Sequence, residues 1–338
     1  MKVLVTGAKG FIGKEIVAEL EKNNIEVIQV IRPQPDSKSN FWRNNSKIFF
    51  ADITDGKNFK VLEKLENIDA VVHSAGLAHQ FGDTKKEKFE LVNVKGTSNV
   101  TELTAKLKAK QLILISSTAV YGIKRKGKKE ERKTRDAFII DEKTACLPET
   151  DYAQSKLDGE EICLNICEKN KIPLTIFRLA PVIGEENSGN VARLIATIDQ
   201  GRFFWVGNGK NLKSLIYKRD VAKACLKILK EKNGGTEIFN LAAEPVQIKE
   251  IVCEIAALLE KRISKIFIPP AALAVIFGVN AKFLGVKKIN KIAQTIEKWL
   301  SDDIYSGKKI ADKYGFKPET SIKEAIEKQV KWYKQQKS

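Results

Sequence analysis

The sequence predicts an α/β fold: a doubly wound parallel sheet with a smaller, discontinuous subdomain toward the C-terminus. Short apolar runs rich in β-branched residues alternate with helical patterns from the first residues onward. A glycine-rich turn joins the first predicted strand to the first predicted helix. The 338 residues are enough to bury the core of such a fold. Strands that alternate with helices pair in parallel, because the chain must cross over the sheet between them.

The first half of the chain carries the clearest alternation. Residues 2–6 form an apolar strand that ends at a glycine, and residues 11–21 have the spacing of an amphipathic helix. Further strands are predicted over residues 26–31, 48–51, 68–73, 111–116 and 174–178, and a long helix over 151–168.

The pattern loosens after residue 178. A helix is predicted over 190–200, a strand over 214–217, a helix over 220–230 and a strand over 237–241. The chain is therefore expected to leave the sheet and return to it. Short helices dominate beyond residue 247, and Pro318 precedes a capped terminal helix over 321–333.

Lysine and arginine exceed aspartate and glutamate by 17, which raises the question of an anionic partner. The densest basic run, residues 124–129, holds no aromatic residue that could stack on a base, so no nucleic acid is expected. The most apolar stretch, residues 269–286, is interrupted by Asn280 and Lys282 and falls short of the roughly 20 apolar residues of a membrane span. We predict a buried helix pair there and no stable membrane insertion.

The five cysteines are scattered without a CxxC pair, and the two histidines, His73 and His79, lack the spacing of a metal motif. Neither a disulfide framework nor a metal site is expected. Met1 leads directly into the first strand, which leaves no room for a signal peptide, so we expect a cytoplasmic protein.

Gly7, Gly10 and Gly13 lie at the junction of the first strand and the first helix. Glycines at this spacing let the backbone turn tightly, approach a pyrophosphate and pack the helix onto the sheet, while the helix N-terminus offers N–H groups to the anion. This junction predicts a Rossmann-like dinucleotide site that also includes Phe11 and Ile12.

The second strand ends in Ile31–Arg32, where an acid that binds the adenosine ribose is usual. Arg32 offers a cation where a 2′-phosphate would lie, which favours NADP over NAD, unless the side chain simply points into solvent. Asp52 ends the next apolar run and precedes Ile53. It is placed either to accept a hydrogen bond from an adenine amino group or to cap the next turn.

Tyr152 and Lys156 lie one turn apart on a predicted helix. A phenol is a poor acid or base near neutral pH unless a cation lies beside it. The same spacing recurs at residues 305/309 and 333/337, which we interpret as surface helix residues. Only the first pair follows a strand whose carboxyl end carries the small hydroxyl side chains of residues 116–118.

Together these features resemble the extended short-chain dehydrogenase/reductase family, specifically its nucleotide-sugar epimerases, dehydratases and 4-ketoreductases. The resemblance covers nearly the whole chain. It rests on the glycine loop, Asp52, His73–Gly76, Asn93–Thr97, Ser117–Gly122, the Tyr152/Lys156 pair and Arg178–Gly184. It implies an NAD(P)-dependent enzyme. We assign residues 1–178 and 213–243 to its cofactor-binding domain, and residues 179–212 and 244–338 to its substrate-binding subdomain.

The resemblance also assigns roles. It makes Tyr152 the catalytic acid/base, Lys156 the residue that holds the nicotinamide ribose and lowers the tyrosine pKa, and Ser117 the hydroxyl that polarises the sugar carbonyl or alcohol. Further cofactor contacts are implied for Ala75, Gly76 and Asn93. The substrate-side candidates are Thr118, Asn187, Asn190 and Lys213.

Lys213 falls where the family usually has an arginine for the nucleotide diphosphate, so the bidentate fork is lost. Asn187 and Asn190 could equally serve as capping or loop residues. Two further departures bear on the reaction. Thr118–Ala119 stands where dehydratases commonly have Asp–Glu, so water elimination is not expected. Ile31–Arg32 lacks the acid that the family's 4-epimerases, which hold NAD tightly, tend to have at the end of the second strand. An exchangeable NADPH suits a net reduction better.

The leading hypothesis is therefore an NAD(P)-dependent reductase acting at C4 of a UDP-type nucleotide sugar. The alternatives are a UDP-glucose or UDP-N-acetylglucosamine 4-epimerase, a reductase of an apolar ketone, and a non-catalytic NADP sensor. The long insertion over residues 123–145 is hypothesised to overhang the sugar pocket, so that neutralising its basic run would raise KM at low salt. Ile162, Leu164 and Ile166 are apolar on the tyrosine helix, where family members often dimerise, so they favour a homodimer or belong to the core.

Overall fold

An eight-stranded sheet lies at the centre of the computed structural model, which describes residues 1–33, 41–43, 46–78, 84–122, 138–231, 234–264, 267–268 and 299–337. The strand order is β13-β8-β6-β5-β1-β2-β4-β3. Seven of these strands run parallel, and β3 pairs antiparallel with β4 at one edge. The bounds are β1 Lys2–Thr6, β2 Glu26–Ile31, β3 Phe41–Arg43, β4 Ser46–Phe50, β5 Ala70–His73, β6 Gln111–Ser117, β8 Leu174–Leu179 and β13 Thr236–Leu241. The predicted doubly wound parallel sheet is confirmed.

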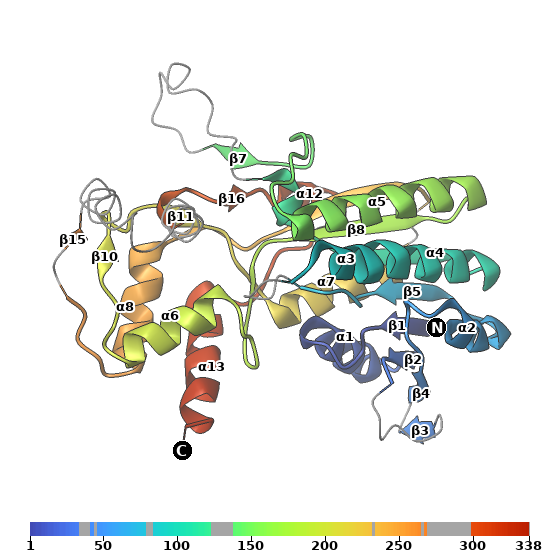
Figure 1. Ribbon diagram of the computed structural model, residues 1–338, viewed down its shortest axis with the longest axis horizontal. Helices are drawn as coiled ribbons and strands as arrows, with labels where there is room; N and C mark the ends of the chain where they lie inside the picture. The colour runs from blue at the N-terminus through green and yellow to red at the C-terminus, as the bar shows by residue number, and fades with distance from the viewer. Residues whose placement is uncertain are drawn as a thin grey trace.

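Helices cover both faces of this sheet (Figure 1). On one face α1 (Phe11–Lys22) packs against α7 (Lys218–Lys230), and on the other α4 (Gly96–Lys106) packs against α5 (Asp151–Asn170). Every residue of β8 is buried, including Thr175 and Arg178 in its otherwise apolar sequence. The chain returns to the sheet as β13, which pairs with β8 as the loosened pattern after residue 178 predicts.

Three helices form a second, smaller unit beside the sheet, as predicted (Figure 1). They are α6 (Asn190–Asp199), α8 (Ile248–Leu258) and α13 (Ile322–Gln335), and they share their own apolar cluster. The residue boundaries of the two domains remain predictions.

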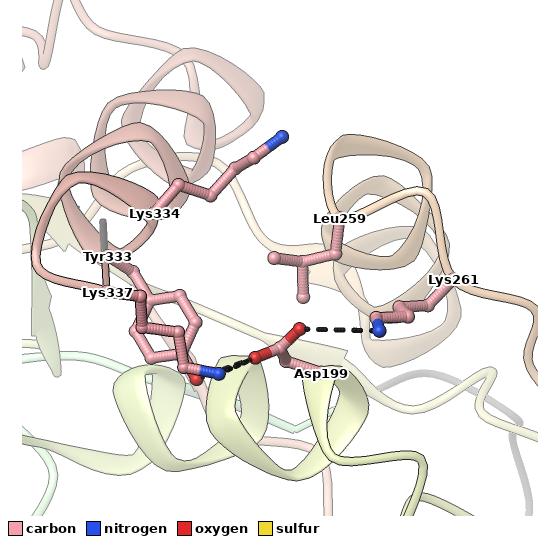
Figure 2. Close-up of a pocket in the computed structure, with 6 residues that line it drawn as sticks. All are labelled: Asp199, Leu259, Lys261, Tyr333, Lys334 and Lys337. Carbon is pink, nitrogen blue, oxygen red and sulfur yellow. Dashed lines mark hydrogen bonds and ion pairs between the residues drawn. The ribbon is translucent and has the colours of Figure 1, made fainter.

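Asp199, the last residue of α6, joins this helix to α13 and to the segment that follows α8 (Figure 2). Its carboxylate accepts hydrogen bonds from Lys337 and, at 3.0 Å, from the hydroxyl of Tyr333, and it lies 3.7 Å from the Lys261 ammonium. These side chains line a surface hollow of about 300 Å³ together with Leu259 and Lys334. An acid at the C-terminal end of a helix is disfavoured by the helix dipole, so its partners must offset that interaction.

The remaining elements are short. The strands are β7 Ile139–Ile140, β9 Val182–Ile183, β10 Trp205–Val206, β11 Leu212–Lys213, β12 Ile216–Tyr217, β14 Val246–Gln247, β15 Phe267–Ile268 and β16 Ile304–Tyr305. The helical segments are α2 Gly56–Phe59, η1 Lys60–Lys64, α3 Lys86–Phe89, η2 Glu90–Lys95, η3 Thr118–Tyr121 and α12 Lys308–Tyr314.

One interpretation of the sequence is wrong. Tyr305 belongs to strand β16, which pairs with β7, and not to a surface helix. Its ring stacks on Tyr121 with 6.3 Å between the ring centroids. Tyr333 does lie on a helix, where it is half-buried. In the described part of the chain no helix is long and apolar enough to cross a bilayer. The basic run over 124–129, His79 and the apolar stretch over 269–286 lie outside the described residues.

Candidate active site

The glycine loop has the tight geometry that its sequence predicts. Gly7 has a φ of +69°, and a methyl group added there would lie 2.6 Å from the backbone nitrogen of Ala75. A methyl group on Gly13 would lie 2.0 Å from the carbonyl oxygen of Gly7. The loop therefore presses α1 onto β1, and only glycine fits at these two positions.

The N-terminus of α1 is a suitable site for a pyrophosphate. Gly10 is its N-cap and provides no side-chain hydrogen bond to the first turn, so the N–H groups around Phe11 and Ile12 are left to an anion. No acidic residue lies in this first turn. The residues present thus fit a dinucleotide with its diphosphate at the helix end.

The residues expected around the adenosine lie at the ends of β2 and β4. Arg32 is exposed directly after β2. Asp52 accepts hydrogen bonds from the backbone N–H and the hydroxyl of Thr54, both at 2.8 Å through Oδ1, so it does cap its own turn. Ile53 is buried, and its carbonyl accepts a 2.6 Å hydrogen bond from Asn99. An adenine contact by Asp52 remains a prediction that would use its second oxygen.

Asn93 fixes the loop that follows β5. Its amide group exchanges two hydrogen bonds with the backbone of Leu77, at 2.7 and 3.0 Å, and donates a third to the Ser155 hydroxyl on α5 at 3.0 Å. A methyl group added to Gly76 would lie 3.3 Å from Asn93 Oδ1 and 3.9 Å from Lys156 Nζ. These contacts bring Gly76, Asn93 and Lys156 together at the carboxyl edge of the sheet.

Helix α5 places the tyrosine and the lysine beside the end of β6. Thr150 caps the helix by accepting a 3.1 Å hydrogen bond from the Ala153 N–H, so Tyr152 lies in the first turn. The hydroxyl groups of Tyr152 and Ser117 are hydrogen-bonded. Lys156 donates a 2.6 Å hydrogen bond to the carbonyl oxygen of Ile115 on β6. The sequence-predicted catalytic set of Ser117, Tyr152 and Lys156 is thus brought together.

Burial governs the charge states in this site. It raises the pKa of Tyr152 above its usual value, and the hydrogen bond from Ser117 opposes this shift only in part, so the lowered tyrosine pKa that the resemblance implies is wrong for this site. Burial lowers the pKa of Lys156 to about 8, against the opposing effect of the Glu160 carboxylate. The pKa of His73 falls to about 3 through burial and the nearby Lys156, so this imidazole is neutral. Its two ring nitrogens are hydrogen-bonded to the hydroxyl groups of Thr6 and Thr97, at 2.7 and 3.0 Å, within the core.

The four substrate-side candidates differ in burial and in their hydrogen-bond partners. The buried Thr118 donates to the Leu179 carbonyl at 3.1 Å. Asn187 donates a hydrogen bond to the Val182 carbonyl and accepts one from the Gly189 N–H within its own loop, and Asn190 is exposed at the start of α6. The side chain of Lys213 is 12% exposed, and its ammonium pairs with Asp303 at 2.5 Å. Their substrate contacts remain predictions.

Sequence reasoning missed a buried ion pair beneath the site. Arg178 and Glu160 are joined by three hydrogen bonds of 2.7 to 3.2 Å. The sequence places Arg178 in a segment that resembles the family and Glu160 on a predicted helix, and it does not pair them. The spacing of Glu160 one turn after Lys156 could have indicated a carboxylate near that lysine. No group of three or more potential metal ligands gathers among the described residues.

Comparisons with known proteins identify the family. The model of the NAD dependent epimerase/dehydratase family matches residues 3–242. The N-acetyl-alpha-D-glucosaminyl-diphospho-ditrans,octacis-undecaprenol 4-epimerase of Escherichia coli O157:H7 is 30% identical over 276 residues, covering 79% of this chain and 75% of its own length. A putative UDP-glucose 4-epimerase of Methanocaldococcus jannaschii is 28% identical, with 98% of each chain covered.

The fold agrees with that assignment. The structure of UDP-glucuronic acid 4-epimerase from Bacillus cereus in complex with NAD superposes with a TM-score of 0.74 over 100% of both chains, at 21% identity. The glycine loop, the parallel sheet and the tyrosine helix are therefore parts of an enzyme of the extended short-chain dehydrogenase/reductase type, and the chain belongs to the NAD-dependent epimerase/dehydratase family.

Proposed function

We propose that this protein transfers hydride at C4 of a diphosphate-linked sugar with an NAD(P) cofactor, and that Tyr152 is the acid/base. The observation that carries the proposal is the convergence of Ser117, Tyr152 and Lys156 at the carboxyl end of β6. The names of the relatives support the substrate class, because the three compared above are described as 4-epimerases of diphosphate-linked sugars.

A bound nicotinamide supplies or accepts the hydride. Ser117 donates a hydrogen bond to the C4 oxygen, where negative charge develops as a carbonyl is reduced. Tyr152 gives its proton to that oxygen, and the Lys156 cation stabilises the phenolate that remains. The raised pKa of Tyr152 keeps the phenol protonated near neutral pH, which is the form that a reduction requires.

Within this chemistry we propose the net reduction of a 4-keto sugar, with NADPH as the preferred cofactor. The support is local: Arg32 is exposed at the end of β2, where a 2′-phosphate would lie, and the sequence has Ile31–Arg32 where an acid is usual. A cofactor that exchanges with each turnover suits a net reduction. Water elimination is not proposed, because Thr118 and Ala119 provide no acid/base pair after Ser117.

A sugar 4-epimerase is the second candidate, and the names of the relatives favour it. An epimerase oxidises C4, lets the keto sugar rotate and reduces it again, so it must retain its cofactor throughout. The two candidates therefore differ in how the protein treats nicotinamide.

Purified, desalted protein separates these reactions. The reductase proposal predicts a nearly empty site and stoichiometric consumption of added NADPH with a 4-keto nucleotide sugar. Nicotinamide that survives desalting, together with interconversion of C4 epimers without net cofactor consumption, would instead identify the epimerase. Absence of both activities across UDP-, dTDP- and polyprenyl-diphosphate-linked sugars would contradict the proposal as a whole.

We also propose a cytoplasmic location and a homodimer formed through α5. Half-buried Ile162 and Ile166 support the dimer, whereas Leu164 packs against the core. Sedimentation equilibrium of the wild type and of Ile162→Lys checks it, and two monomeric species would overturn it.

A further inference from the structure

A buried ion pair lies next to the proposed catalytic set of Ser117, Tyr152 and Lys156 and is not part of it. The side chains of Arg178 on β8 and Glu160 on α5 are 6% and 1% exposed, and Arg178 Nη2 lies 2.7 Å from Glu160 Oε2. Taking both charges out of water is unfavourable, and an apolar pair of similar volume is often as stable. The stability of the fold alone therefore gives a weak reason for this pair.

Glu160 joins the two elements that carry the catalytic side chains. It lies one turn after Lys156 on α5, and it accepts a hydrogen bond from the buried hydroxyl of Ser116 on β6. Ser116 directly precedes Ser117. One carboxylate thus connects the helix of Tyr152 and Lys156 to the residue before the catalytic hydroxyl.

Arg178 anchors the chain on the other side of Ser117. Its Nη1 donates a 3.0 Å hydrogen bond to the hydroxyl of Tyr121, and its guanidinium lies 4.9 Å from the centroid of that ring. Tyr121 ends η3, the turn that follows Ser117, and its hydroxyl donates at 2.8 Å to Asn240 Oδ1 on β13. The segments before and after Ser117 are therefore both held by the same ion pair.

We propose that Glu160 and Arg178 are positioning residues for the reaction: they fix the Ser117 hydroxyl relative to Tyr152 and place a carboxylate beneath the Lys156 ammonium. The inference rests on the proposed function of Ser117, Tyr152 and Lys156. A hydroxyl displaced by about 1 Å is enough to slow a reaction on the order of a hundredfold.

The electrostatic part of the inference concerns the proton of Lys156. The groups that act on this ammonium are Glu160 and Cys163 from its own helix, which favour the charged form, and His73 from β5, which is neutral. Burial pushes its pKa down to about 8 and Glu160 opposes that shift. Without the carboxylate, Lys156 would lose its proton at a lower pH.

Two variants test the geometry and the charge separately. Ser116→Ala removes only the tie to Glu160 and keeps the ion pair. Glu160→Gln/Arg178→Met replaces both charges by neutral side chains of similar volume, which avoids leaving one charge buried alone. Asp220→Asn is the matched control. Asp220 is a fully buried carboxylate that accepts hydrogen bonds from the backbone of Glu319 and Thr320, both at 3.2 Å, away from Ser117.

The expected results are specific. Ser116→Ala lowers kcat on the order of tenfold to a hundredfold with KM little changed. The double variant shows a similar loss and moves the alkaline limb of its kcat profile to lower pH. Competitive labelling of Lys156 with acetic anhydride, read by mass spectrometry, moves its midpoint in the same direction and needs no turnover. Asp220→Asn loses thermal stability without either shift.

A double variant that melts as the wild type does and keeps its kcat, pH profile and labelling midpoint would overturn the inference. A loss of activity that tracks loss of stability, with both midpoints unmoved, would also overturn it, because the pair would then be structural only. An inactive wild type would contradict the proposed function instead, and the labelling midpoint would still decide the charge effect.

Discussion

Lys156 Nζ lies 2.6 Å from the carbonyl oxygen of Ile115, two residues before Ser117. This contact connects α5 to β6. Because an ammonium has three N–H donors, two of them remain for a ribose or for a group beside Tyr152. The burial of this cation also sets the pH range in which it carries its charge.

The first prediction concerns that pH range. The pKa of Lys156 is lowered by burial to about 8, so the lysine is charged below this pH and neutral above it. We therefore expect kcat to fall as pH rises through about 8, and Lys156→Met to lose on the order of a hundredfold or more in kcat at neutral pH. Steady-state assays from pH 6 to 10 check this. A wild-type rate that stays flat to pH 10 would contradict the role of the Lys156 charge.

Gly13→Ala tests the glycine loop. The added methyl group would lie 2.0 Å from the Gly7 carbonyl oxygen, so α1 must shift away from the loop. We expect a stability loss of roughly 1–3 kcal/mol and loss of cofactor binding. Gly56→Ala is the control, because a methyl group there has no atom within 4 Å. Fluorescence titration with NADPH and NADH on both variants measures the effect, and equal affinities would contradict it.

Arg32→Asp tests the cofactor preference. If Arg32 binds the 2′-phosphate, its loss should weaken NADPH binding on the order of tenfold to a hundredfold while NADH binding is kept or improved. Lys108→Asp makes the same charge change at an exposed position far from β2. An unchanged ratio of the two affinities in Arg32→Asp would mean that the side chain only faces solvent.

Asp199→Asn tests the contacts by which Asp199 joins α6 to the C-terminal helix α13 and to Lys261 after α8. The hydrogen bond from Lys337 is the largest of the effects that lower the pKa of Asp199. A carboxyl group with a lowered folded-state pKa contributes stability above its unfolded pKa and loses it as pH falls through the folded value. We expect a lower Tm for the variant at pH 7 and a difference that shrinks toward pH 3 and at high salt. A difference independent of pH and salt would contradict an electrostatic tie.

Much of this molecule could be predicted because its signals are local. The strand over residues 2–6 and the strand over 26–31 have the predicted bounds, and the helix predicted over 151–168 ends two residues later, at Asn170. Each is specified by its own apolar period and by the residues at its ends. The catalytic set was predictable for a different reason. Tyr152 and Lys156 follow a strand that ends in small hydroxyl side chains, and this context distinguishes them from the two other Tyr/Lys pairs with the same spacing, 305/309 and 333/337.

The predictions became weaker where partners are distant in sequence. The sequence around Lys213 does not predict its ion pair with Asp303. The sequence around Arg178 likewise does not predict its hydrogen bond to Tyr121, or the hydrogen bond from Tyr121 to Asn240. Tyr305 was misassigned for this reason, since its pairing with Ile140 across β16 and β7 is set by tertiary packing. Side-chain partners of this kind depend on the assembled sheet and not on a local period.

The most direct test of the central claim is turnover by Tyr152→Phe, which removes one hydroxyl and keeps the ring that packs edge-on against Phe89. The wild type and the variant are assayed with NADPH and NADH on a panel of 4-keto and 4-hydroxy nucleotide sugars, with cofactor affinity measured on both. The account predicts that the variant binds cofactor as the wild type does and loses turnover on the order of a hundredfold or more. Turnover left intact in Tyr152→Phe would contradict it.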